Sequence, residues 1–130
     1  DDGRAALVAT AGNPDTHLIL RGGRAGPNCD AHSVHGASRM LADAGLNPRL
    51  LVDCSHANSG KDPLRQPQVA AELLAQRRAD ERAVAGLMLE SHLETGKQAI
   101  GADMRYGVSV TDACLGWTET RALFETLAAG

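Results

Sequence analysis

Aromatic residues are almost missing from this chain of 130 residues, which contains one Trp, one Tyr and one Phe. Aromatic side chains usually contribute the largest apolar surfaces of a protein core. A core built from Ala, Val and Leu alone is thin for a domain of this length. The composition therefore indicates either an unusually regular fold or one part of a larger fold.

A basic surplus and long apolar runs are also missing. The 13 Lys and Arg residues are outnumbered by 16 Asp and Glu residues, whereas binding to nucleic acid phosphates needs the opposite balance. No apolar run is long enough to cross a membrane, and no stretch resembles a signal peptide. Three cysteines, an odd number, favour a reducing compartment. We therefore expect a cytoplasmic protein that binds neither nucleic acid nor membranes.

Three short apolar segments are expected to form parallel strands, because they lack the alternation of strands that face water on one side. These segments cover residues 16–20, 49–54 and 83–89. Helical patterns follow them at residues 30–44, 66–78 and 118–129. Gly45 is expected to end the first helix and Thr118 to cap the last one. Residues 5–10 are expected to add a short strand or hairpin arm. The alternating order predicts the α/β class.

The spacing of polar residues behind the strands suggests a barrel. Arg21, His56 and Glu90 lie 35 and 34 residues apart, which is the repeat of a (β/α)8 barrel. Such a barrel needs about 250 residues to close, whereas this chain supplies three or four strands. A doubly wound sheet is the other arrangement of such units, but no GxGxxG motif follows a strand. We expect residues 1–130 to be the C-terminal part of one (β/α)8 barrel domain, with no separate domains.

Residues whose side chains can bind a metal ion or a substrate follow each predicted strand, and they would meet at one mouth of the barrel. They are Arg21, Ser55, His56, Asn58, Lys61, Glu90, His92 and, before the last helix, Asp112. His, Glu and Asp together form a set of divalent-metal ligands, and an Arg beside two glycines suits a phosphate. Each residue alone also has a structural explanation as a turn, cap or hydrogen-bonded side chain. Together they indicate an enzyme that uses a metal ion and a phosphorylated substrate.

Several motifs occur in the order and spacing of a known family. They are LRGG at 20–23, PN at 27–28, DCSHANS at 53–59, GLMLESHL at 86–93, YG at 106–107 and TDACLGW at 111–117. In these motifs, from about residue 12 onward, the chain resembles the class I (type Iα) 3-deoxy-D-arabino-heptulosonate 7-phosphate (DAHP) synthases. The resemblance implies the last three βα units of a (β/α)8 barrel and the hairpin arm that precedes them.

The resemblance also implies roles for individual residues. The metal ligands would be His56, Glu90 and Asp112, and the metal would be Mn, Fe, Co or Zn. The family's Cys ligand matches none of Cys29, Cys54 and Cys114. Arg21 would bind the phosphate of phosphoenolpyruvate and, with His56, serve catalysis. Asn58 and Lys61 are weaker candidates for substrate binding.

The implied reaction is the aldol-type condensation of phosphoenolpyruvate with erythrose 4-phosphate, the first step of the shikimate pathway, by a full-length homo-oligomer. The isolated 130-residue chain is expected to be inactive. Two alternatives stay open. One is the related 3-deoxy-D-manno-octulosonate 8-phosphate synthase, which acts on arabinose 5-phosphate. The other is an inactive metal-binding fragment or interaction module.

Overall fold

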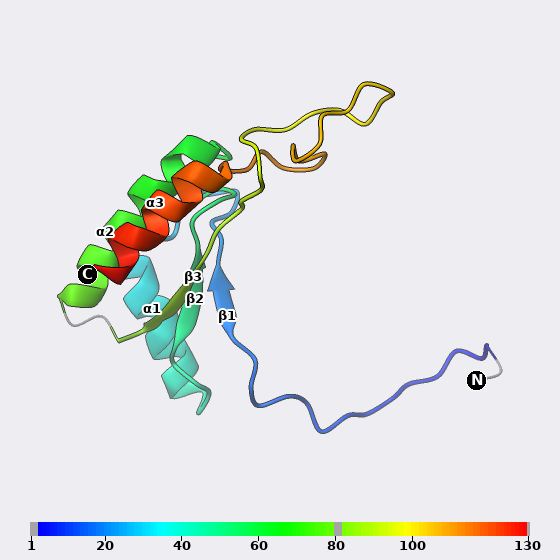
Figure 1. Ribbon diagram of the computed structural model, residues 1–130. Helices are drawn as coiled ribbons and strands as arrows, with labels where there is room; N and C mark the ends of the chain where they lie inside the picture. The colour runs from blue at the N-terminus through cyan, green and yellow to red at the C-terminus, as the bar shows by residue number, and fades with distance from the viewer. Residues whose placement is uncertain (1–2, 80–81, 130) are drawn as a thin grey trace.

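Three parallel strands form the sheet at the centre of the molecule (Figure 1). The computed structural model describes residues 3–79 and 82–129. The strands are β1 (Leu18–Leu20), β2 (Leu50–Asp53) and β3 (Val84–Met88), hydrogen-bonded in the order β1-β2-β3. Their carboxyl ends therefore lie at one edge of the sheet. The α/β class predicted from the alternating pattern is confirmed.

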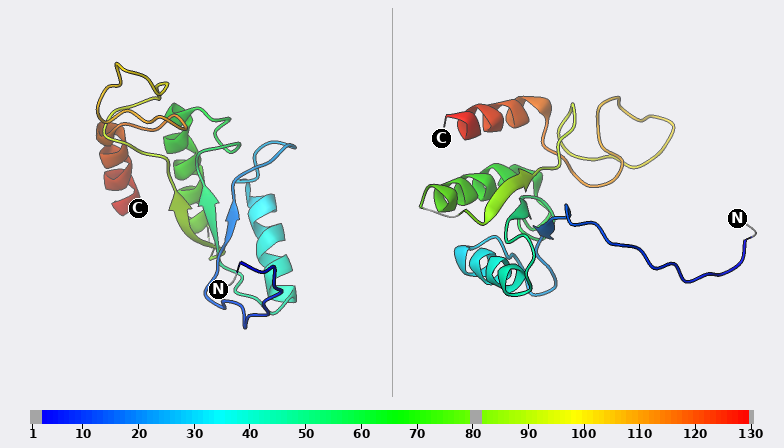
Figure 2. Two further views of the ribbon diagram at one scale, coloured as in Figure 1. Left: turned by 90° about the vertical axis from the view of Figure 1, so that its right-hand side faces the viewer. Right: turned by 90° about the horizontal axis from the view of Figure 1, so that it is seen from below.

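The helices lie together on one side of this sheet (Figures 1 and 2). They are α1 (Ala31–Asp43), α2 (Gln66–Arg78) and α3 (Trp117–Ala128), with a short 3-10 helix, η1 (Pro63–Arg65), directly before α2. The core forms where helix and sheet residues meet, and it includes Val34, Leu50, Val52, Leu73 and Leu123. Small and medium aliphatic side chains fill it, as the shortage of aromatics predicts.

The ends of the helices show how local sequence sets their limits. Asp30 caps α1 by accepting a hydrogen bond from the backbone N–H of Ser33. Gly45 has a φ of 70° and donates its N–H to Ala42, which confirms the predicted stop. The predicted cap of the last helix at Thr118 is wrong, because α3 starts one residue earlier, with Gly116 as its cap. A Cβ on residue 116 would lie only 2.6 Å from a carboxylate oxygen of Glu119, so the chain is tightly packed at this position.

The strand or hairpin arm predicted for residues 5–10 is wrong. These residues contain no strand, and the segment before β1 extends away from the sheet (Figures 1 and 2). Leu7 and Val8 are exposed. A strand is stable only when a neighbouring strand satisfies its backbone groups, and no described residue pairs with this segment.

The prediction that the strands are covered on both faces is only partly correct. Val52 is fully buried, but Leu18 and Ile19 of β1 remain 42% and 40% exposed. Strand β1 lies at the edge of the sheet, so fewer neighbours cover it. Apolar surface therefore remains uncovered along this strand. Separately, among the described residues, no helix is long and apolar enough to span a membrane.

Candidate metal centre

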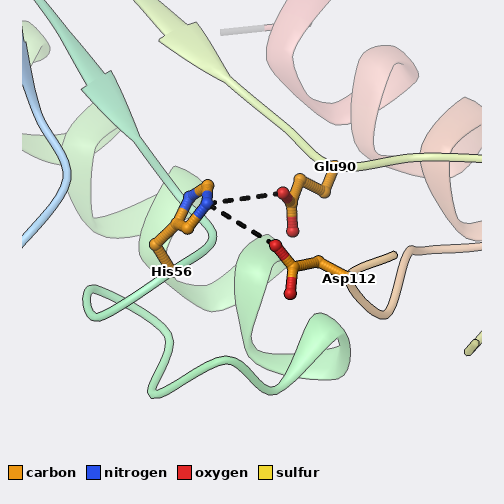
Figure 3. A group of neighbouring side chains, drawn as sticks. All are labelled: His56, Glu90 and Asp112. Carbon is orange, nitrogen blue, oxygen red and sulfur yellow. Dashed lines mark ion pairs between the residues drawn. The ribbon is translucent and has the colours of Figure 1, made fainter.

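Three side chains predicted as metal ligands converge at the carboxyl edge of the sheet (Figure 3). His56 follows β2, Glu90 follows β3, and Asp112 lies in the loop before α3. The Nε2 atom of His56 is 3.5 Å from Oε1 of Glu90 and 3.9 Å from Oδ2 of Asp112. All three potential ligand atoms lie within 4.8 Å of one another. One ion could therefore contact all three after small adjustments of the side chains.

The orientation of His56 is set by a buried carboxylate that the motif analysis did not single out. Asp53, fully buried at the end of β2, lies with Oδ2 2.6 Å from Nδ1 of His56. Its other oxygen accepts hydrogen bonds from the hydroxyl and backbone N–H of Ser55. A carboxylate can only accept, so it favours the histidine tautomer with hydrogen on Nδ1. The lone pair on Nε2 then points toward Glu90 and Asp112, as metal ligation requires.

The backbone of Glu90 is held in place by two hydrogen bonds to one side chain. The buried side-chain amide of Gln66, at the start of α2, donates to the carbonyl of Glu90 and accepts from its N–H, at 3.1 and 2.9 Å. This pair of bonds fixes the chain where β3 ends and the ligand begins. Sequence reasoning missed Gln66, because 24 residues separate it from Glu90 and no local motif marks it.

The charged groups around Glu90 shift the pKa of its carboxyl group. Burial is the main cause that raises the pKa of Glu90, and the charges of Asp112 and Asp53 raise it further. His56 and Arg21 act in the opposite direction and lower it. Arg21 does not line the cavity beside the cluster, and its role in substrate binding stays a prediction. Three carboxylates around one imidazole form an arrangement that a divalent cation would stabilise.

Arg21 lies in a loop that is packed tightly against the loop after β2. Gly22 has a φ of 72°, and its N–H donates to the side chain of Asn28 at 2.7 Å. A Cβ on residue 22 would lie 2.6 Å from the Cβ of Ala57, next to His56. Gly22, one of the two glycines predicted to let a phosphate approach the backbone, therefore allows the Arg21 loop to lie against the His56 loop.

We expect the substitution Gly22→Ala to destabilise the protein by at least about 2 kcal/mol, because a left-handed φ and a steric clash act together. The melting temperature of the full-length protein, followed by circular dichroism, would measure the loss. Gly36→Ala in α1 is the matched control: nothing lies within 4 Å of its added Cβ. Because alanine favours helices, the control should melt at the same or a higher temperature. Equal melting temperatures of the two variants would contradict the close approach of Gly22 to Ala57.

The two weaker substrate-binding candidates occupy different environments. Asn58 is 2% exposed, and its amide group donates to the carbonyls of Leu20 and Asp53 and accepts from the N–H of Asn28. These contacts tie the loops after β1 and β2 together. Lys61 is exposed and adopts a φ of 64°. Both substrate-binding assignments remain predictions.

A small cavity of about 110 Å³ opens beside the ligand cluster. Lys61 and Lys97 line it, together with His56, Glu90 and Asp112. Lys97 was not among the predicted site residues, since it lies in the long loop after β3 but well beyond the end of that strand. His92, in contrast, is exposed, does not line this cavity, and accepts a hydrogen bond from its neighbour Leu93. The cavity thus combines carboxylates with two ammonium groups.

None of the three cysteines belongs to the ligand cluster. Cys54 is fully buried, and burial raises the pKa of its thiol to about 12. Burial also raises the pKa values of Cys29 and Cys114. A thiol binds metal as the thiolate, so these environments oppose a role as ligand. The expectation that no cysteine here takes the place of the family's Cys ligand stays a prediction.

Comparison with known proteins assigns the chain to a family. The model of the DAHP synthetase I family matches residues 3–125. The chain belongs to this family. A putative phospho-2-dehydro-3-deoxyheptonate aldolase from Schizosaccharomyces pombe is 53% identical over 98% of the chain. The Tyr-sensitive phospho-2-dehydro-3-deoxyheptonate aldolase of Escherichia coli is 48% identical over 96% of the chain.

The structure agrees with that of a family relative. A phospho-2-dehydro-3-deoxyheptonate aldolase from Francisella tularensis superposes with a TM-score of 0.88 and 40% sequence identity. The match covers 95% of this chain but 36% of that one. The chain likewise spans 36% of the S. pombe and E. coli relatives. It therefore corresponds to about a third of a longer family member.

Proposed function

We propose that the full-length protein containing this chain is a DAHP synthase. It would condense phosphoenolpyruvate with erythrose 4-phosphate to form DAHP and inorganic phosphate, the first step of the shikimate pathway. The observation that carries the proposal is the convergence of His56, Glu90 and Asp112 in a chain of this family. The names of its relatives support the same activity.

The proposed architecture is a single (β/α)8 barrel domain to which these residues contribute the C-terminal part. Three parallel strands with helices on one side are compatible with a section of a barrel wall. The uncovered apolar surface of β1 would then pack against the remainder of the barrel. We further propose a cytoplasmic homo-oligomer, as the family resemblance implies.

His56, Glu90 and Asp112 would hold one divalent cation, with Mn, Fe, Co and Zn as candidates. The fit rests on the donor set: one imidazole nitrogen oriented by Asp53, and two carboxylates whose mutual repulsion a cation would relieve. Nitrogen and oxygen ligands of this kind suit several divalent ions. When bound, the ion would supply Lewis-acid polarisation of the aldehyde carbonyl.

The residues of the chain would bind and orient the substrates. The guanidinium of Arg21 would pair with the phosphate of phosphoenolpyruvate and fix the direction of its enol carbon. Lys61 and Lys97, which line the cavity beside Glu90, would attract a second anionic group. Asn58 would hold the loops of Arg21 and His56 at a fixed separation through its hydrogen bonds. Proximity of the two substrates is the main effect expected from these contacts.

The activity can be tested by measuring phosphate release from phosphoenolpyruvate by the full-length protein, with erythrose 4-phosphate or arabinose 5-phosphate as the second substrate. Turnover with erythrose 4-phosphate is expected. Turnover with arabinose 5-phosphate alone would favour the 8-phosphate synthase, and metal binding without turnover would favour an inactive module. We expect the isolated 130-residue chain to be inactive in the same assay, and turnover by it would contradict the proposed barrel fragment.

A further inference from the structure

A second cavity, far from the metal centre along the sheet, is rich in arginine. It has a volume of about 600 Å³ and lies at the amino ends of β2 and β3, whereas His56 and Glu90 follow their carboxyl ends. Its polar lining consists of Arg49, Arg77, Arg78 and Arg82, with Ser38 of α1. Three separate segments bring these arginines together: the segment before β2, the end of α2 and the segment before β3. We call this cavity the arginine groove.

The arginine groove concentrates positive charge on a chain whose net charge is -3. Within residues 3–79 and 82–129, no acidic side chain lines it, and no ion pair joins Arg49, Arg77 or Arg78 to a carboxylate. The dipole of α2 accounts for arginines in the last turn of that helix. It does not account for Arg49, which lies outside the helix. The guanidinium groups of Arg49, Arg77 and Arg78 can therefore donate to a bound anion.

The lining indicates which anion would fit. A guanidinium group matches a phosphate through two parallel hydrogen bonds, and the hydroxyl of Ser38 can add another donor. The volume lies within the usual range for small-molecule sites. Among the described residues, no aromatic side chain lines the groove, so these residues offer no stacking surface for a nucleobase. Its apolar lining consists of Pro48, Ala83 and Val84.

We propose that the arginine groove binds a phosphorylated small molecule without an aromatic base, held through Arg49, Arg77 and Arg78. The ligand is either an organic phosphate ester or inorganic phosphate or pyrophosphate, since these share the recognised group. The site is separate from the metal centre, because the two occupy opposite ends of the same strands. Its occupancy does not depend on the reaction proposed above.

The test is calorimetric titration of the full-length protein with inorganic phosphate, pyrophosphate and fructose 1,6-bisphosphate. The double variant Arg49→Gln/Arg78→Gln should bind the preferred probe at least about tenfold more weakly, since hydrogen bonds between charged groups are lost. Arg77 is left intact because it also lines an apolar cavity beside Leu73 and Phe124. The matched control is Arg4→Gln/Arg121→Gln, which removes the same charge from exposed positions outside the groove and should change binding less than twofold.

The outcomes distinguish organic from inorganic phosphate, and binding in the arginine groove from binding at Arg21. Tighter binding of fructose 1,6-bisphosphate indicates an organic ester, and tighter binding of pyrophosphate or phosphate indicates an inorganic ligand. Arg21→Gln should leave this binding intact, even if it abolishes synthase activity. If Arg49→Gln/Arg78→Gln fails to fold, Arg49→Lys/Arg78→Lys retains the charge and should still weaken binding by losing the guanidinium geometry. Equal binding by the groove and control variants, or no binding of any probe at about 10 mM, would overturn the proposal.

Discussion

Replacing His56 by alanine in the full-length protein is expected to abolish metal retention and lower turnover at least about a thousandfold. Polarisation of a carbonyl by a bound cation contributes several kcal/mol to a transition state, and each 1.36 kcal/mol is a factor of about ten in rate. Glu90→Ala should have the same effect, because both side chains face one position (Figure 3). Elemental analysis after gel filtration would measure the metal, and phosphate release the turnover.

His92→Ala is the matched control for this experiment. It changes the same residue type two positions after Glu90, but the side chain is exposed and lies outside the ligand cluster. We expect it to keep metal and activity within a factor of about three, as for most exposed substitutions. Retention of normal metal content by either ligand variant would refute the ligand assignment.

Replacing Asp53 by asparagine is expected to weaken metal binding about 10- to 100-fold, the usual effect of removing a carboxylate that orients a ligating histidine. The substitution keeps the shape of the side chain but replaces one accepting oxygen with a donating NH₂ group. His56 would then lose the partner that keeps hydrogen on Nδ1. Competition with a metal chelator would measure the affinity.

A structural readout separates this effect from a general loss of stability. Nitrogen NMR of His56 in the metal-free protein should show hydrogen moving from Nδ1 toward Nε2 in the Asp53→Asn variant. Asp43→Asn, an exposed substitution at the end of α1, is the control and should change neither property. Unchanged affinity with an unchanged tautomer would show that Asp53 does not orient the ligand.

The convergence of His56 and Glu90 could be predicted from the sequence because parallel strands impose a simple rule. Residues that follow each apolar segment must lie at the same edge of the sheet, whatever the details of packing. His56 and Glu90 satisfy this rule directly. Asp112 lies far from any strand end, so this rule does not place it; it was added as a carboxylate in the loop before the last helix, and the family resemblance implies its role as a ligand. Its side chain nevertheless lies 3.9 Å from His56 in the structure.

The failed predictions concern segments whose conformation depends on distant partners. Residues 5–10 have a strand-like composition, but a strand needs a neighbouring strand, and none of the described residues pairs with them. The start of α3 was misplaced by one residue, since a capping side chain was expected at Thr118, whereas the cap is Gly116, which lies close to Glu119 and Thr95. A missing partner therefore explains the first failure, and close packing around Gly116 accompanies the second.

By itself the sequence determined the class of fold, the order of strands and helices, and the identity of the residues at the ends of the strands. These properties follow from apolar periodicity and turn residues, which act over a few neighbouring positions. Only the tertiary structure decided that Asp53 orients His56, that Gln66 holds the backbone of Glu90, and that four arginines share one groove. Hydrogen bonds and charge clusters of this kind depend on the distances between folded elements, which no local pattern encodes.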